Sequence, residues 1–244
     1  NSFGSYAINT QYFNWGEPLL NSNTPQYIRE SRRFLTRTSI STNLSVNFDA
    51  EDLVDSGLDF LVVSVDGATA STYKKYRVGG NLDLVLSNLA RLVEARKKLH
   101  SKTPFIMWRY LLFDHTIAEM GKAEALAGQM GVDSINFAEP YDVSAHDKTI
   151  TKPKNVPIRS HVFNMQAGAG CWSIINAIAN LHPIIDDQWE VTWHSRMTGD
   201  YADHSKMGTC QWLYMNMAMD AVGRIMPCCF EPYRRPTSIF GSIN

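Results

Sequence analysis

A turn near the start of the chain combines a glycine, a carboxylate and a proline directly after a β-rich run. The run covers Thr10 to Asn14, and the turn contains Gly16, Glu17 and Pro18. The glycine lets a ligand approach the backbone, the proline fixes the turn, and Glu17 offers a carboxylate to an ammonium or hydroxyl group. An ordinary turn between a strand and a helix explains the same residues, so this turn alone does not identify a site.

Two further β-rich runs also end in small polar residues. Asn43 follows the run Arg37 to Thr42, and Ser64 and Asp66 stand at the end of the run Leu58 to Val65. Each of these residue types is also common in turns and helix caps. Three successive strands that deliver polar groups to one rim indicate a binding site more strongly than any single residue does.

Arg77 lies downstream of these runs, shortly before the glycine pair Gly79-Gly80. The planar fork of arginine matches the geometry of a carboxylate. Arg77 is therefore either part of a solvated helix end or a guanidinium aimed at a carboxylate.

Strand-like runs alternate with helical patterns along the first 140 residues. Besides the three runs above, Pro104 to Phe113 and Ser134 to Phe137 have the composition of strands. The expected helices run from Thr24 to about Arg33, from Asp49 to Gly57, from Leu82 to about Leu99, and from a capping box at Thr116 to Glu119 up to Gly131. This alternation predicts right-handed crossovers and a parallel sheet, either doubly wound or barrel-like, with ligands at the carboxyl ends of the strands.

Aromatic and polar residues alternate along the last two strand-like runs. Some of Trp108, Arg109, Tyr110, Asn136 and Glu139 must face the side on which a ligand would lie. Which of them do so depends on the register, because a slip by one residue exchanges the two faces.

Composition and charge exclude several classes of protein. Hydrophobic residues make up 44% and charged residues 19%, which is typical of a globular protein and excludes a disordered tail or a fibre. The net charge of -1 gives no basic field, so we expect neither a nucleic-acid nor a membrane partner. With no apparent signal or membrane segment and four cysteines that make a poor disulfide framework, we expect a cytoplasmic location.

The motifs occur in a characteristic order. They run from Gly-Glu-Pro-Leu-Leu at 16–20, through Ser-Thr-Asn at 41–43 and Ser-Val-Asp-Gly at 64–67, to Tyr73, Arg77 and the glycine pair. In this order and at about these spacings they resemble the radical SAM superfamily. The C-terminal residues, with Cys210, 12 residues, Gly223, four residues and Cys228, resemble that superfamily's SPASM or twitch-type extension. The resemblance covers most of residues 11–137 and 209–244.

The resemblance implies an α/β fold, a partial (β/α)6 TIM-like barrel of parallel strands with a small C-terminal extension that contains a β-hairpin. It also implies a 4Fe-4S cluster and S-adenosylmethionine, from which a 5'-deoxyadenosyl radical arises and abstracts a substrate hydrogen. The cofactor-binding residues that it implies are Gly16, Glu17 and Pro18 at the methionine amino group, Ser64 and Asp66 near the ribose and methionine, Asn43, and Arg77 near the carboxylate.

Cys210 and Cys228 are implied as ligands of an auxiliary iron-sulfur cluster. Cys171 is either a further ligand or a buried thiol, and the adjacent Cys229 is expected to pack as a small apolar side chain.

The sequence departs from the family pattern in two places. Trp15 stands where the family has the first glycine of Gly-Gly-Glu-Pro. The family's Cys-x3-Cys-x2-Cys loop is also missing, since no cysteine precedes Cys171. We therefore expect the first strand and the ligands of the catalytic cluster upstream of Asn1, and no reaction by this chain alone.

We expect three segments: a barrel at 1–140 without its first strand and cluster loop, an unassigned connection at 141–208, and the start of an auxiliary-cluster domain at 209–244. The expected partners are a peptide or small-molecule substrate and a reductant such as flavodoxin or ferredoxin.

Two alternative functions stay open. One is a non-catalytic relative that binds S-adenosylmethionine or substrate, and the other is an iron-free aldolase-like enzyme with acid-base chemistry at Glu17, Asp66 and Arg77.

Overall fold

The computed structural model describes residues 9–13, 16–140, 149–155 and 157–164, together with the backbone of three short strands near the C-terminus. The chain divides into two compact units, residues 1–182 and 183–244. The site residues that can be described all belong to the first unit.

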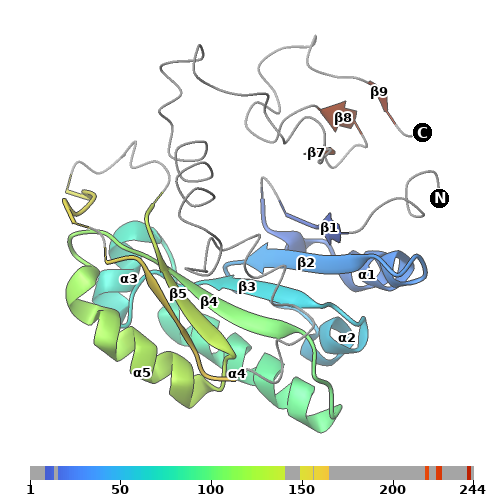
Figure 1. The fold of residues 1–244 in the computed structure, drawn as a ribbon, viewed down its shortest axis with the longest axis horizontal. Coiled ribbons are helices and arrows are strands. Elements are labelled where there is room, and N and C mark those ends of the chain that lie inside the picture. Colours follow the sequence, from blue (N-terminus) through green and yellow to red (C-terminus); the bar gives the residue numbers. More distant parts are fainter. Residues whose placement is uncertain are drawn as a thin grey trace, which may run out of the picture. The chain divides into compact units, whose positions relative to one another are not determined.

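The first unit contains a six-stranded sheet whose strands follow one another in chain order (Figure 1). Its strands are β1 (Asn9–Gln11), β2 (Arg37–Thr42), β3 (Phe60–Ser64), β4 (Phe105–Leu111), β5 (Ser134–Ala138) and β6 (Arg159–Val162). The first five are parallel, as predicted. A strand order that never reverses is that of a barrel-like sheet, because a doubly wound sheet reverses its order at a switch point.

Helices connect the parallel strands. They are α1 (Thr24–Arg32), α2 (Ala50–Asp55), α3 (Ala70–Tyr76), α4 (Leu82–Lys98) and α5 (Met120–Met130), with two 3-10 turns, η1 (Pro18–Leu20) and η2 (Ile117–Glu119). Right-handed crossovers between strands in this order place successive helices on one face, and Figure 1 shows α3, α4 and α5 together on one side of the sheet. Within the described residues, no helix is both long enough and apolar enough to cross a bilayer.

The last strand of the sheet corrects the expectation that all strands are parallel. β6 pairs with β5 in the antiparallel direction and lies in the segment that the sequence left unassigned. A parallel neighbour needs a crossover connection, usually a helix, whereas the described residues between the two strands form none.

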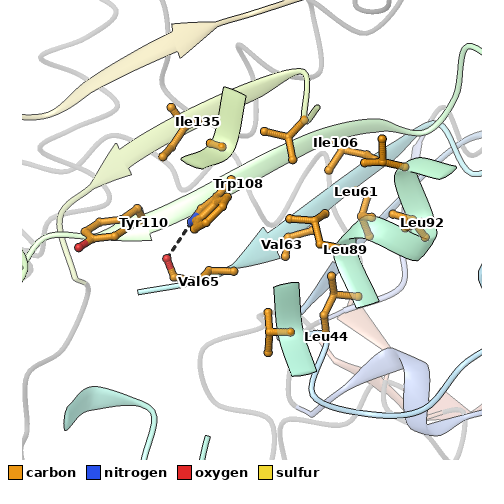
Figure 2. Packing of buried hydrophobic residues seen from close by; sticks show 14 of the residues in the cluster. Leu44, Leu61, Val63, Val65, Leu89, Leu92, Ile106, Trp108, Tyr110 and Ile135 are labelled. Atoms are coloured by element: carbon orange, nitrogen blue, oxygen red, sulfur yellow. Dashed lines mark hydrogen bonds between the residues drawn. The ribbon is translucent and has the colours of Figure 1, made fainter. Parts of the chain in front are cut away.

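The core lies between the sheet and its helices (Figure 2). Alternate residues of β3 and β4 are fully buried there, and α4 contributes Leu89 and Leu92. Trp108 belongs to this core, and its indole Nε1 donates a hydrogen bond of 2.8 Å to the carbonyl oxygen of Val65. Tyr110 belongs to the same core cluster.

The intervening residues of each strand point to the other side of the sheet, which we call the inner face. It carries Phe60, Val62 and Ser64 on β3, Phe105, Met107 and Arg109 on β4, and Ser134 and Asn136 on β5. The register therefore answers the question that the sequence left open, with Arg109 and Asn136 on the inner face and Trp108 and Tyr110 on the helical side.

The second unit contains a three-stranded antiparallel sheet formed by β7 (Ala218–Met219), β8 (Arg224–Met226) and β9 (Gly241–Ser242). β7 and β8 are antiparallel neighbours. The residues between them, 220–223, lie outside the described residues, so the β-hairpin expected in the C-terminal extension stays a prediction.

Candidate functional site

The carboxyl ends of β1, β2 and β3 form one rim of the sheet, because the three strands are parallel and neighbours in register. Glu17 follows β1, Asn43 follows β2, and Ser64 ends β3 just ahead of Asp66. The fold thus places the predicted cofactor-binding residues at one edge, as expected for a ligand site in a parallel sheet.

Glu17 ties the turn after β1 to the end of β2. Its Oε1 accepts hydrogen bonds from the Thr42 hydroxyl at 2.6 Å and from the Leu19 amide at 3.1 Å, while its Oε2 accepts from the Asn43 amide at 2.9 Å. A carboxylate has about four lone-pair sites, so these three bonds leave about one free. The side chain is only partly buried. It can therefore hold the rim together and still accept a proton donor from a ligand.

Gly16 and Pro18 shape the same turn. Gly16 has φ of 110°, which favours glycine, and a Cβ built on it would meet no atom within 4 Å. Pro18 is the first residue of η1, and the Glu17 side chain caps this 3-10 turn. The backbone therefore borders open space beside Glu17. Trp15, the departure from the family pattern, lies outside the described residues.

The side chain of Asn43 makes its hydrogen bond within its own turn. Its Oδ1 accepts a hydrogen bond of 2.8 Å from the Ser45 amide, which closes an Asx-type turn. The structure brings Asn43 next to Glu17 through its backbone amide, so its role toward a ligand stays a prediction.

Asp66 and Arg77 form a buried ion pair. Asp66 is fully buried, and its Oδ2 accepts from the Arg77 Nε at 2.7 Å and pairs with Nη2 at 2.5 Å. Its Oδ1 accepts a third hydrogen bond, of 2.8 Å, from the Leu111 amide. Burial would lower the pKa of Arg77, but the neighbouring Asp66 outweighs this effect and raises that pKa. Arg77 thus binds a carboxylate of the protein itself, and the pair joins the segment after β3 to the end of α3 and to β4.

Ser64 begins a polar row across the inner face. The register pairs Ser64 with Arg109 on β4 and Arg109 with Asn136 on β5. Asn136 is in turn paired with Ser160 on β6. The Asn136 Nδ2 donates to the Ser160 hydroxyl at 3.0 Å. Sequence reasoning named Arg109 and Asn136 but could not assign their faces.

Several buried polar atoms on this face have no hydrogen-bond partner. They are Arg109 Nε, Asn136 Oδ1, Ser134 Oγ and, on β2, Ser39 Oγ. Most buried polar atoms in proteins are hydrogen-bonded, so a group of orphaned atoms on one face indicates a surface that a polar ligand completes.

Glu119 holds two loops of the rim together, which corrects a prediction. The sequence places Glu119 in a capping box with Thr116, but Thr116 makes no side-chain cap. Instead the Glu119 carboxylate accepts from the Ala68 amide at 2.8 Å, the Thr69 hydroxyl at 2.7 Å and the Thr72 hydroxyl at 2.9 Å. Thr116 turns back to bond with Phe113. The spacing of Thr116 and Glu119 is that of a capping box, but the Glu119 carboxylate binds donors from residues 68–72 instead of capping the helix.

We expect Glu119→Ala to lower the free energy of unfolding by about 1–3 kcal/mol at pH 7, since three hydrogen bonds to a charged acceptor are lost. Burial would raise the pKa of Glu119, but the bonds from Thr69, Ala68 and Thr72 prevail and lower it. The Glu119 carboxylate therefore stabilises the folded protein fully at pH values above its pKa in the unfolded chain. This stabilisation is lost as the pH falls through its lower pKa in the folded protein. Urea unfolding of both proteins at pH 7 and pH 3 measures this difference in stability.

A matched control is Glu94→Ala on the solvent-exposed side of α4, where the carboxylate is 73% exposed. It should change the free energy of unfolding by less than about 0.5 kcal/mol. A difference between wild type and Glu119→Ala that is equally large at both pH values would contradict the assigned role of the carboxylate.

The predicted iron-sulfur ligands cannot be placed. Cys171, Cys210 and Cys228 lie outside the described residues, as does Cys229. Among the residues that the structure describes, no three His, Cys, Asp or Glu side chains are grouped as metal ligands. The auxiliary cluster therefore stays a prediction.

Comparison with sequences of known proteins gives partial matches. No protein-family model matches the chain. The chain is 30% identical over 132 residues to a probable GTP 3',8-cyclase of Methanococcus aeolicus, which is 52% of this chain and 42% of that protein. It is 33% identical over 104 residues to the GTP 3',8-cyclase of Lactiplantibacillus plantarum, covering 41% and 30% of the two chains. The chain thus spans less than half the length of these curated relatives.

Comparison with solved structures concerns the fold. Streptococcus suis SuiB is similar with a TM-score of 0.56 at 14% identity, over 94% of this chain and 52% of that chain. A structure of SuiB bound to S-adenosylmethionine matches with the same TM-score and identity. The chain is thus similar in sequence to part of the GTP 3',8-cyclases, and it shares its fold with SuiB.

Proposed function

We propose that this chain is the body of a radical SAM enzyme that binds S-adenosylmethionine at the rim formed by Gly16, Glu17, Asn43, Ser64 and Asp66. The observation that carries the proposal is the position of Glu17, a partly exposed carboxylate at the carboxyl edge with about one acceptor site left. The curated relatives are enzymes, and the fold is shared with a protein whose structure contains S-adenosylmethionine.

Each residue of the rim would have its own role in binding the cofactor. Glu17 would accept hydrogen bonds from its ammonium group, and the open space at Gly16 would admit it to the backbone. Ser64 would donate or accept through its hydroxyl group. Asp66, whose oxygens are engaged by Arg77 and Leu111, would act by fixing the end of β3. We assign Arg77 to the same positioning role.

S-adenosylmethionine held at this rim, together with a 4Fe-4S cluster, would supply radical chemistry for the abstraction of a hydrogen atom from the substrate. Cys210 and Cys228, with Cys171 as a third candidate, are proposed to hold an auxiliary cluster. A reductant such as flavodoxin or ferredoxin would supply the electron, and the inner face of the sheet would exclude water around the reacting groups.

The substrate is a peptide or a small molecule. Both classes occur among similar proteins, since two curated relatives are named as GTP 3',8-cyclases and a SuiB structure contains the precursor peptide SuiA. The alternative of a non-catalytic relative differs in one observable, because it would bind S-adenosylmethionine and form no 5'-deoxyadenosine.

The test uses the intact, cluster-loaded protein. We expect wild type to bind S-adenosylmethionine in a calorimetric titration and to release 5'-deoxyadenosine after reduction. Glu17→Gln should weaken binding by about 10- to 100-fold, since a charge-assisted hydrogen bond contributes about 1.5–3 kcal/mol. Its iron content should equal that of wild type.

Glu30→Gln on α1 is the matched control, because its carboxylate is 53% exposed and pairs only with the neighbouring Arg33 among the described residues. This variant should bind S-adenosylmethionine as wild type does. Unchanged affinity in a folded Glu17→Gln protein would place the cofactor elsewhere, and binding without 5'-deoxyadenosine would favour the non-catalytic alternative.

A further inference from the structure

Two guanidinium groups, of Arg77 and Arg109, interact with one buried carboxylate that follows β3. Asp66 is bound by two nitrogens of Arg77 and by the Leu111 amide. Arg109 interacts with Asp66 only electrostatically, and it makes no ion pair with any described carboxylate. One carboxylate therefore interacts with two guanidinium groups, and Arg109 is the one that makes no ion pair with it within the part of the chain that the structure describes.

An arginine in this position needs a partner. The Nε of Arg109 is buried and has no hydrogen-bond acceptor. The side chain as a whole is partly exposed, so the cost falls on its Nε, because burial of a polar atom without a hydrogen bond is costly. Burial lowers the pKa of Arg109, but arginine stays protonated at neutral pH, so the charge persists. The cost is recovered when an anion binds.

The neighbours of Arg109 define the chemistry of that anion. Ser64 and Asn136 flank Arg109 in register on the two adjacent strands, about 4.8 Å away on each side. The guanidinium fork binds a carboxylate or phosphate with two parallel hydrogen bonds. Asn136 Oδ1 is a buried acceptor without a partner, so it calls for an N–H or O–H donor rather than for a second anionic oxygen. The row therefore suits a group in which an oxyanion stands beside a donor.

We propose that Arg109 binds an oxyanion of the substrate, either a carboxylate or a phosphate, while Asn136 accepts a hydrogen bond from an adjacent N–H or O–H of the same molecule. Ser64 belongs both to this row and to the proposed cofactor rim, so the bound group lies next to the cofactor residues. The assignment of the oxyanion to a substrate rests on the proposed function. The anion-binding role of Arg109 does not.

The experiment measures thermal stability of the intact protein with simple anions as probes. Inorganic phosphate or acetate, at about ten times its dissociation constant, should raise the Tm of wild type by about 3 °C. This shift should disappear in Arg109→Gln, which keeps a polar side chain but has no charge. Arg109→Lys should retain part of it. Arg33→Gln, which removes an arginine that is 73% exposed, is the control and should shift as wild type does.

The two probes distinguish the two sources of an oxyanion. A larger shift with phosphate indicates a phosphorylated substrate such as a nucleotide, and a larger shift with acetate indicates a carboxylate of a peptide or acid. In the absence of either anion, Arg109→Gln should be about as stable as wild type, because it removes a partly buried charge whose Nε has no acceptor.

Titration with S-adenosylmethionine separates this inference from the proposed function. Arg109→Gln should bind S-adenosylmethionine within about twofold of wild type. A loss of tenfold or more would make Arg109 a cofactor residue and overturn the inference, as would equal anion shifts in wild type and Arg109→Gln or no shift in either. An Arg109-dependent anion shift in a protein that binds no S-adenosylmethionine would instead refute the proposed function alone.

Discussion

Asp66→Ala is expected to lower the free energy of unfolding by about 3–5 kcal/mol, the usual result of removing one partner from a buried ion pair. Asp66 is fully buried, and Arg77 is only 27% exposed, so water cannot replace the lost carboxylate well. The substitution leaves Arg77 and Arg109 without a described counter-charge and the Leu111 amide without its acceptor. Urea unfolding followed by tryptophan fluorescence measures the loss.

Two further variants separate charge from shape at this position. Asp66→Asn keeps an acceptor for the Leu111 amide and should therefore cost less than Asp66→Ala. Asp55→Ala removes a carboxylate that is 68% exposed and bound to Arg29, and it should cost at most about 1 kcal/mol. If Asp66→Ala and Asp55→Ala cost the same, the pair is solvated in solution and does not hold the rim together.

Gly67→Ala should destabilise the protein by about 2–3 kcal/mol. A Cβ on Gly67 would lie 2.4 Å from the backbone nitrogen of Tyr73 and 2.6 Å from its Cα. These are backbone atoms of α3, so no side-chain rotation relieves the clash and the helix itself must move. Because Arg77 caps the end of α3, that movement also disturbs its ion pair with Asp66. The free energy of unfolding in urea reports the effect.

Gly121→Ala is the matched control, since Gly121 lies in α5 and a Cβ there meets no atom within 4 Å. Alanine should stabilise that helix by about 0.5–1 kcal/mol. Opposite signs at the two glycines are the expected result. A neutral Gly67→Ala protein would show that α3 does not pack directly on the segment after β3.

Much of the sheet could be predicted from the sequence, because its signals are local. Hydrophobic runs bounded by turn residues located β2 to β5 within two residues, and Asp49 caps α2 as predicted. The rim followed from the alternation of strands and helices. Local signals were sufficient wherever neighbours in the sequence determined the structure.

The failures concern long-range partners. Glu119 fits a capping box by spacing, yet donors some 50 residues away in the sequence bind it. Arg77 is aimed at a carboxylate, one of the two alternatives from the sequence, but its partner Asp66 lies 11 residues away on the other side of α3 and could not be named from the sequence. The face of Arg109 depended on a register that only pairing with β3 and β5 defines. None of these contacts has a periodic signature in the sequence.

Side chains along β3 and β4 alternate between two roles, packing in the core on the helical side and forming the inner face on the other. Residues such as Val63 and Trp108 on the helical side maintain the core, while Ser64 and Arg109, their immediate neighbours in the chain, face the other way. Ser64 and Arg109 are the partly exposed polar residues of this face on the two strands, whereas Phe60, Val62, Phe105 and Met107 are fully buried. Variation in ligand preference that leaves the packing intact is therefore confined to the carboxyl ends of β3 and β4.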